Sequence, residues 1–164
     1  MSRTILTLTV LTLTMAATAD AQQPIPEYGP DVTIEQAKKV VAAAEVEAKK
    51  QKWPVAITIV DTHGDLVLFE KLDQTQYGSI DISIEKAKTA ALYRRPSKAF
   101  EDLIAQGGIN LRLARHPALP IEGGIPLTVD GKIIGAIGVS GVKSNEDGIV
   151  AQAGVDALSP AVKK

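Results

Sequence analysis

The chain has 164 residues, of which 45% are hydrophobic and 4% aromatic, with 18 basic residues, 19 acidic residues and no cysteine. This length and composition predict one folded domain with its own hydrophobic core. A net charge of −1 provides no basic field for a phosphate backbone, so we expect no nucleic-acid partner. The lack of cysteine excludes disulfide scaffolds, iron–sulfur clusters and thiol nucleophiles.

Residues 1–21 have the pattern of a secretory signal peptide. Arg3 gives a positive start, an apolar stretch follows, and Ala19-Asp20-Ala21 has the small residues of a cleavage site. The apolar stretch is too short to span a bilayer stably. We therefore expect a periplasmic or secreted protein with no membrane attachment after cleavage. Residues 22–32, rich in proline, are predicted to form an arm ahead of a single domain at 33–164.

The first half of this domain begins with a helix and continues with a hairpin. Residues 33–36 have the spacing of a capping box, and apolar residues at helical intervals then predict a helix over about 34–50. Residues 55–60 are apolar on both faces of a strand, which is typical of a central strand. Turn residues at 61–65 and a second strand at 66–70 complete the hairpin.

Two helices follow the hairpin. The pattern is helical from Ser79 until Arg95-Pro96 breaks it, with Lys86 interpreted as facing solvent. Ser97 is expected to cap a shorter helix over 98–106, which the next two glycines end. Residues 109–122 are irregular, with room for one short strand.

A second hairpin and a last helix complete the chain. Asp130-Gly131 between apolar runs at 125–129 and 132–140 predicts a two-residue type I′ turn. Ser144 is expected to cap a helix over 146–158. Hairpins imply an antiparallel sheet, so the fold class is α+β. Strands that are apolar on both faces need helices on both faces or a partner subunit. Because the chain has few helices to cover them, we expect a homo-oligomer.

The two histidines, His63 and His116, fall in different loops and lack the spacing of a closed metal site. Each is a candidate single metal ligand or acid–base group, and each is equally compatible with an ordinary exposed loop residue. The sequence Glu122-Gly123-Gly124 can make a simple bulge or line a pocket with its backbone. Arg94-Arg95, at a helix C-terminus, complements the helix dipole or forms an anion clamp.

Five segments in register resemble the GlcG/HbpS-type haem-binding family, which is related to the C-terminal domain of PduO-type corrinoid proteins. They are residues 53–61, 78–90, 95–97, 122–126 and 135–141. The similarity runs from about Thr33 to Leu158. It implies a profilin-like α+β fold with a central antiparallel sheet and helices on its faces, assembly into oligomers, and haem binding.

A haem needs an apolar slot, cations for its propionates and optionally an axial ligand. The candidate axial or metal ligands are His63 and His116, and Tyr77 and Tyr93 could also coordinate. The candidate propionate partners are Lys88, Arg94, Arg95 and Arg115. The candidate lining residues are Glu122, Gly123 and Gly124. Because aromatic residues are few, we expect a shallow, exposed or intersubunit site.

Three classes of function remain open on these residues. The first is an exported module that sequesters or senses haem. The second is an enzyme that degrades haem, or that acts on a small hydroxy or keto acid through His63, Arg95 and Glu122. The third is an accessory subunit of an oxidoreductase.

Overall fold

The computed structural model describes residues 25–158, so the predicted signal peptide lies outside the described residues. The elements, in chain order, are α1 (Ile34–Gln51), β1 (Ala56–Val60), β2 (Leu66–Lys71), α2 (Ser79–Tyr93), α3 (Lys98–Ala105), the 3-10 helix η1 (Gly108–Arg115), β3 (Gly124–Val129), β4 (Lys132–Ser140) and α4 (Ser144–Asp156). The strands form one antiparallel sheet in the order β2-β1-β4-β3. The predicted α+β class, built from two hairpins, is confirmed.

Local sequence signals explain two of the element boundaries. At the start of α1 the Gln36 N–H donates to Thr33 Oγ1 (3.2 Å) and the Thr33 N–H donates to Gln36 Oε1 (2.9 Å), which is the predicted capping box. Between β3 and β4, Asp130 and Gly131 both have positive φ, 49° and 76°. Two consecutive positive φ angles define the type I′ turn that an Asp-Gly pair favours.

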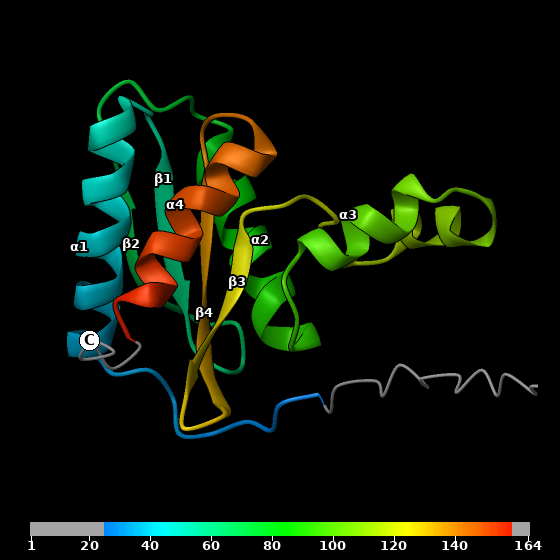
Figure 1. The fold of residues 1–164 in the computed structure, drawn as a ribbon, viewed down its shortest axis with the longest axis horizontal. Helices are drawn as coiled ribbons and strands as arrows, with labels where there is room; N and C mark the ends of the chain where they lie inside the picture. The colour runs from blue at the N-terminus through cyan, green and yellow to red at the C-terminus, as the bar shows by residue number, and fades with distance from the viewer. Residues whose placement is uncertain (1–24, 159–164) are drawn as a thin grey trace, which may run out of the picture.

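Helices cover both faces of the sheet (Figure 1). Helices α1 and α4 contact each other and the strands on one face, and α2 crosses β1 and β4 on the other. The larger core therefore lies beneath α1 and α4 and includes Val40, Ile57, Ile137 and Val150. The chain's own helices thus bury the two-sided apolar strands, and no partner subunit is needed to cover them.

Helix α2 approaches the sheet closely because small residues face each other across the contact. A Cβ placed on Gly138 of β4 would lie 2.0 Å from the Ser83 backbone oxygen and 2.9 Å from Ala87 Cβ. Beside it, the Thr58 and Ser83 hydroxyls are hydrogen-bonded at 2.8 Å in the buried contact. Glycine at 138 is therefore what lets the α2 backbone lie against β4.

Three details differ from the sequence predictions. The Ser97 hydroxyl does not cap α3; it donates to the Ile121 carbonyl (2.6 Å) and accepts from the Gly124 N–H (2.9 Å). Helix α4 begins at Ser144, one residue after its N-cap at Lys143. Residues 109–122 contain no strand and include most of η1, which packs on α3.

Helix α3 and η1 form an arm that extends from the body of the domain (Figure 1). Ile109 is 70% exposed and Leu111 is 56% exposed on this arm. Two large apolar side chains are therefore exposed close together on this arm. Among the helices of residues 25–158, none has the length and apolar character needed to cross a membrane.

Residues 27–32 run along the start of β4. The Ile133 N–H donates to the Glu27 carbonyl, and the Gly29 and Val32 N–H groups donate to the Ile133 and Ile134 carbonyls at 2.7 Å. The Tyr28 hydroxyl donates to the Ala91 carbonyl at the end of α2 (3.0 Å). This segment therefore brings Asp31 close to the turn between β1 and β2.

Candidate functional site

The turn between β1 and β2 holds His63 at the surface. Asp61 Oδ1 accepts hydrogen bonds from the backbone N–H groups of His63 (2.8 Å) and Asp65 (2.9 Å), so the turn is closed by a side chain. The His63 side chain is 76% exposed. The backbone of this histidine is thus fixed while its ring remains open to solvent.

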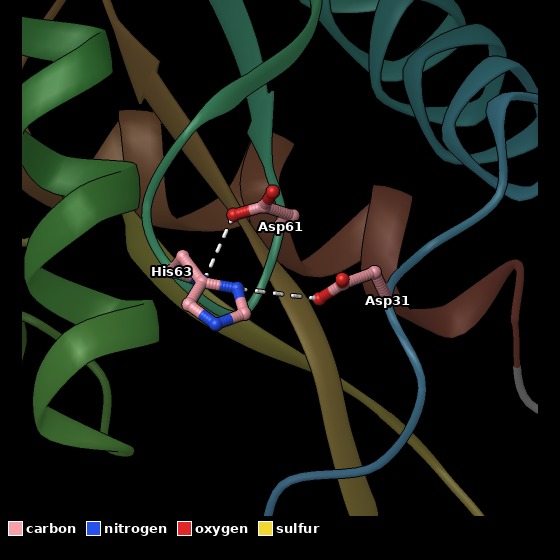
Figure 2. A group of neighbouring side chains, drawn as sticks. All are labelled: Asp31, Asp61 and His63. Atoms are coloured by element: carbon pink, nitrogen blue, oxygen red, sulfur yellow. Dashed lines mark hydrogen bonds and ion pairs between the residues drawn. The ribbon is translucent and has the colours of Figure 1, made fainter.

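Figure 2 shows Asp31 and Asp61 on two sides of the His63 ring. The Thr62 hydroxyl donates to Asp31 Oδ1 (2.5 Å) and lies 3.3 Å from His63 Nδ1. Because that hydroxyl has one hydrogen and gives it to Asp31, it can only accept from the ring, which assigns the ring proton to Nδ1. The neutral ring then has a free lone pair on Nε2, the form in which histidine binds a metal.

Asp31 supports this arrangement electrostatically. Hydrogen bonds from the Thr62 hydroxyl and backbone N–H hold the pKa of Asp31 below its usual range. The group is therefore a carboxylate at neutral pH, with Oδ1 4.0 Å from His63 Nδ1. A carboxylate behind the protonated ring nitrogen orients an imidazole whose other nitrogen ligates a metal.

The same three side chains lie close enough to hold a metal ion between them. Ligand atoms of Asp31, Asp61 and His63 all lie within 4.8 Å of one another. Both carboxylates, however, already have structural partners, since Asp31 binds Thr62 and Asp61 closes the turn. The two aspartates are therefore explained as supports of the turn and of the imidazole.

Cationic and apolar side chains surround the turn. A Cβ on Gly64 would lie 3.5 Å from Cγ atoms of Lys88 and Leu92, so the turn packs on the last part of α2. Leu66 and Leu92 are exposed large hydrophobic residues, and the Arg94 guanidinium lies 5.4 Å from the Tyr28 ring centroid. The structure thus brings two of the predicted residues, His63 and Lys88, to one exposed surface.

His116 has a different environment. It follows η1 and packs on the rings of Tyr93 and Phe100, at centroid distances of 4.9 Å and 6.0 Å. The Ala118 backbone N–H donates to His116 Nδ1 (3.1 Å), so the neutral ring carries its proton on Nε2. Both ring nitrogens are then committed, and His116 is poorly suited to ligate iron in this geometry.

Arg95 lies in the same aromatic cluster. Its guanidinium is 5.7 Å from the Phe100 ring centroid and its Nε donates to the Tyr93 carbonyl (3.2 Å). A stacked and hydrogen-bonded guanidinium at a helix end has a sufficient structural role. The structure does not bring Arg95 into contact with His63.

Glu122, Gly123 and Gly124 line a cavity of about 360 Å³ between the start of β3 and helix α4. Its walls include Ile125 and Ile149, and Lys98 lies at its side with Nζ 3.9 Å from Glu122 Oε2. The prediction that these glycines line a pocket is therefore supported by the geometry. The pocket is separate from the His63 turn, because it is built by β3, α3 and α4.

Sequence reasoning missed a buried ion pair next to this cavity. Lys86 is 1% exposed and Asp147 is 2% exposed, and Lys86 Nζ donates to Asp147 Oδ2 (2.8 Å) and to the Val139 carbonyl (3.0 Å). The interpretation of Lys86 as facing solvent is thus wrong. Its spacing from Ser79, Ser83 and Ala90 on the buried side of α2 is the signal that could have found it.

The ion pair connects α2 and α4, which lie on opposite faces of the sheet, through a gap at the start of β3. A Cβ on Gly123 would lie 2.9 Å from Lys86 Nζ and 2.6 Å from the Val139 oxygen, so glycine keeps this gap open. Burial raises the pKa of Asp147, while Lys86 and the Val142 N–H act in the opposite direction. We assign this pair a role in holding the two helices together.

This chain has a four-stranded antiparallel sheet between two layers of helices, which is the architecture of a profilin-like α+β domain. Comparison with known proteins identifies the family. Residues 32–156 match the family model described as haem degrading protein HbpS-like. The chain belongs to this HbpS-like family.

Curated relatives and solved structures agree with this assignment. Protein GlcG of Escherichia coli K12 is 41% identical over 105 residues, which make up 63% of this chain and 77% of GlcG. A crystal structure of HbpS superposes with a TM-score of 0.72 at 26% identity and covers 89% of this chain and 100% of HbpS. A structure described as a PduOC:haem complex superposes with a TM-score of 0.73 at 25% identity, covering 79% of this chain and 96% of that one.

Proposed function

We propose that this protein is an exported haem-binding protein that sequesters or senses haem, and that His63 is its axial ligand. The single observation that carries the assignment to His63 is the hydrogen-bond network through Thr62 to Asp31, which leaves Nε2 free. Family membership and the haem-bound structural neighbour support haem as the ligand. The signal-peptide pattern of residues 1–21 supports export.

The residues around His63 fit the requirements of a haem at an exposed surface. The His63 Nε2 would supply one axial position, which in turn sets how the iron binds other molecules. Lys88 is a cation that suits a propionate, and Leu66 and Leu92 supply apolar contact. The exposure of these groups supports a shallow site with one face of the porphyrin open to solvent or to a partner.

The alternative of an enzyme acting on a hydroxy or keto acid needs His63, Arg95 and Glu122 to act together. Within residues 25–158 no hydrogen bond or ion pair joins any two of these three side chains. Arg95 packs on Phe100, and Glu122 faces α4 near Gly148. The geometry therefore favours a binding protein over this particular mechanism.

A haemin titration of the mature chain, residues 22–164, tests the proposal through the Soret band. We expect saturable binding by the wild type and by His116→Ala, and at least a tenfold loss of affinity with His63→Ala. His116→Ala is the matched control, because it removes the other imidazole of the chain. Loss of binding in His116→Ala alone would contradict the axial assignment, and an absence of saturable binding in the wild type would contradict haem binding.

Turnover and assembly are tested on the same material. Peroxide added to the haem complex separates a sequestering protein, whose Soret band persists, from a haem-degrading enzyme, whose band decays with release of iron. Copurification with an oxidoreductase would favour the accessory role. We further propose that the protein is a homo-oligomer that buries Ile109 and Leu111 of the α3–η1 arm, and a monomer in light scattering at micromolar concentration would contradict this.

A further inference from the structure

A second cavity, distant from His63, lies at the opposite end of the β1–β2 hairpin. It is open to solvent, has a volume of about 600 Å³ and is bordered by the C-terminal part of α1, the segment joining α1 to β1, and the residues that end β2. Trp53, Pro54 and Leu72 provide its apolar lining, and Glu45 and Glu70 provide carboxylates. Nothing in the proposed haem site uses these residues.

The charged residues of this cavity differ in exposure. Glu45 and Glu70 are half-buried, whereas Lys49, Lys52, Lys71 and Asp73 are exposed at the rim. Lys49 Nζ pairs with Glu45 Oε1 at 2.5 Å and so compensates that carboxylate. The inner wall therefore has a carboxylate at Glu70, and the rim has lysines together with the Asp73 carboxylate.

Glu70 has an acceptor atom that is not satisfied. Its Oε1 is buried and has no hydrogen-bond partner within the described residues. Burial and the neighbouring Glu45 carboxylate raise the pKa of Glu70, and the Lys49 cation offsets them only in part. A buried acceptor without a donor is costly, so a ligand that brings a donor and a positive charge would be favoured here.

We propose that this cavity binds a small organic ammonium ion, with the ammonium group against Glu70 and the carbon chain against Trp53. The indole ring offers both apolar contact and attraction for a cation near its face. The C-terminal end of α1 has a negative partial charge, which also attracts a cation. A ligand that also carries a carboxylate can pair with Lys52 or Lys71 at the rim.

Trp53 is the only tryptophan of the chain, so its fluorescence reports directly on the cavity. We would titrate the full mature chain with n-butylammonium, 4-aminobutyrate and butyrate at constant ionic strength. We expect a saturable fluorescence change with the two ammonium compounds and none with butyrate. With Glu70→Gln, which removes the charge and keeps the shape, the dissociation constant of both should rise at least tenfold.

Glu27→Gln is the matched control. It removes one carboxylate from an exposed position next to Ile133, at the other end of the sheet, and should leave the titration unchanged. Glu70→Gln is expected to fold, since it removes a partly buried charge that Lys49 compensates only in part, and circular dichroism verifies this. No saturable change in the wild type, an equal response to butyrate, or unchanged affinity in Glu70→Gln would each overturn the proposal.

Discussion

Two carboxylates of this protein are removed from water to different extents, Asp147 beside the start of β3 and Glu70 near the end of β2. They differ in whether hydrogen-bond donors reach them. Asp147 is almost completely buried, yet it accepts hydrogen bonds from Lys86 and from the Val142 N–H. Glu70 is less buried, yet its Oε1 has no donor among the described residues. Burial alone therefore does not decide whether a carboxylate stabilises the fold, because the available donors decide it.

The difference separates a structural region from one that can bind something. Lys86 and Asp147 satisfy each other between two helices, which leaves no capacity for a ligand. Glu70 borders a cavity, and the Lys49 cation compensates its charge only in part. Four substitutions test this distinction, from the largest expected effect to the smallest.

Gly138→Ala should have the largest effect, because it disturbs the close contact on which the buried pair depends. The new methyl group would lie 2.0 Å from the Ser83 backbone oxygen, which cannot move without shifting α2. We expect a loss of more than about 4 kcal/mol of unfolding free energy, measured by chemical denaturation. Gly78→Ala, with no atom within 4 Å of its Cβ position, is the control and should change stability by less than about 0.5 kcal/mol. Equal effects of the two would contradict the close-contact explanation.

Lys86→Met should cost about 3–5 kcal/mol, because it leaves the Asp147 carboxylate buried without its cation. The loss should shrink as the pH falls, since protonation of Asp147 removes the unpaired charge. The double variant Lys86→Met, Asp147→Leu should recover part of the stability, as removal of both charges avoids the unpaired one. If the double variant were less stable than Lys86→Met at neutral pH, the unpaired charge would not be the cause.

Glu70→Gln should raise stability at neutral pH by about 1 kcal/mol. Burial raises the pKa of Glu70, so the folded state binds this proton more tightly than the unfolded state does. Its favourable contribution is therefore present at acidic pH and is lost as the pH rises through the folded-state pKa. Thermal unfolding of the wild type and Glu70→Gln between pH 3.5 and pH 8 should show the largest difference in unfolding temperature at neutral pH and a smaller one in acid. A difference that grows in acid would contradict the raised pKa of Glu70.

Lys98→Ala should have the smallest effect. Lys98 Nζ lies 2.6 Å from Asp102 Oδ1, but both side chains are about half exposed, and such ion pairs contribute little. We expect the midpoint of denaturant unfolding to stay at the wild-type value, with or without added salt. A loss comparable to that of Lys86→Met would show that exposure does not distinguish the two pairs.

Local sequence signals predicted the elements of this fold because the relevant interactions are local. The capping box at 33–36 and the Asp130-Gly131 turn involve residues within three positions of one another. The two-sided apolar pattern of β1 predicted a central strand, and β1 does lie between β2 and β4. The short strand allowed within 109–122 was not found, since no local pattern determines how that segment packs on α3.

The candidate sites were only partly predictable. The sequence singled out both histidines, but it gave no reason to prefer His63, because the preference depends on Asp31, which is 32 positions away. The backbone of Gly123 and Gly124 was expected to line a pocket, whereas the partner of Lys86 is 61 positions away and lies on another helix. The cavity at Trp53 was not predicted, since its walls come from two separate parts of the chain.

By itself, the sequence determined the helices, the two hairpins and the two-sided burial of the central strands, because helix caps, turn geometry and hydrophobic periodicity act over a few residues. Tertiary structure alone decided which charged groups are satisfied. Asp31 accepts from Thr62 and Asp147 accepts from Lys86, whereas Glu70 Oε1 has no donor within residues 25–158. Each result depends on which donors the fold brings from distant positions.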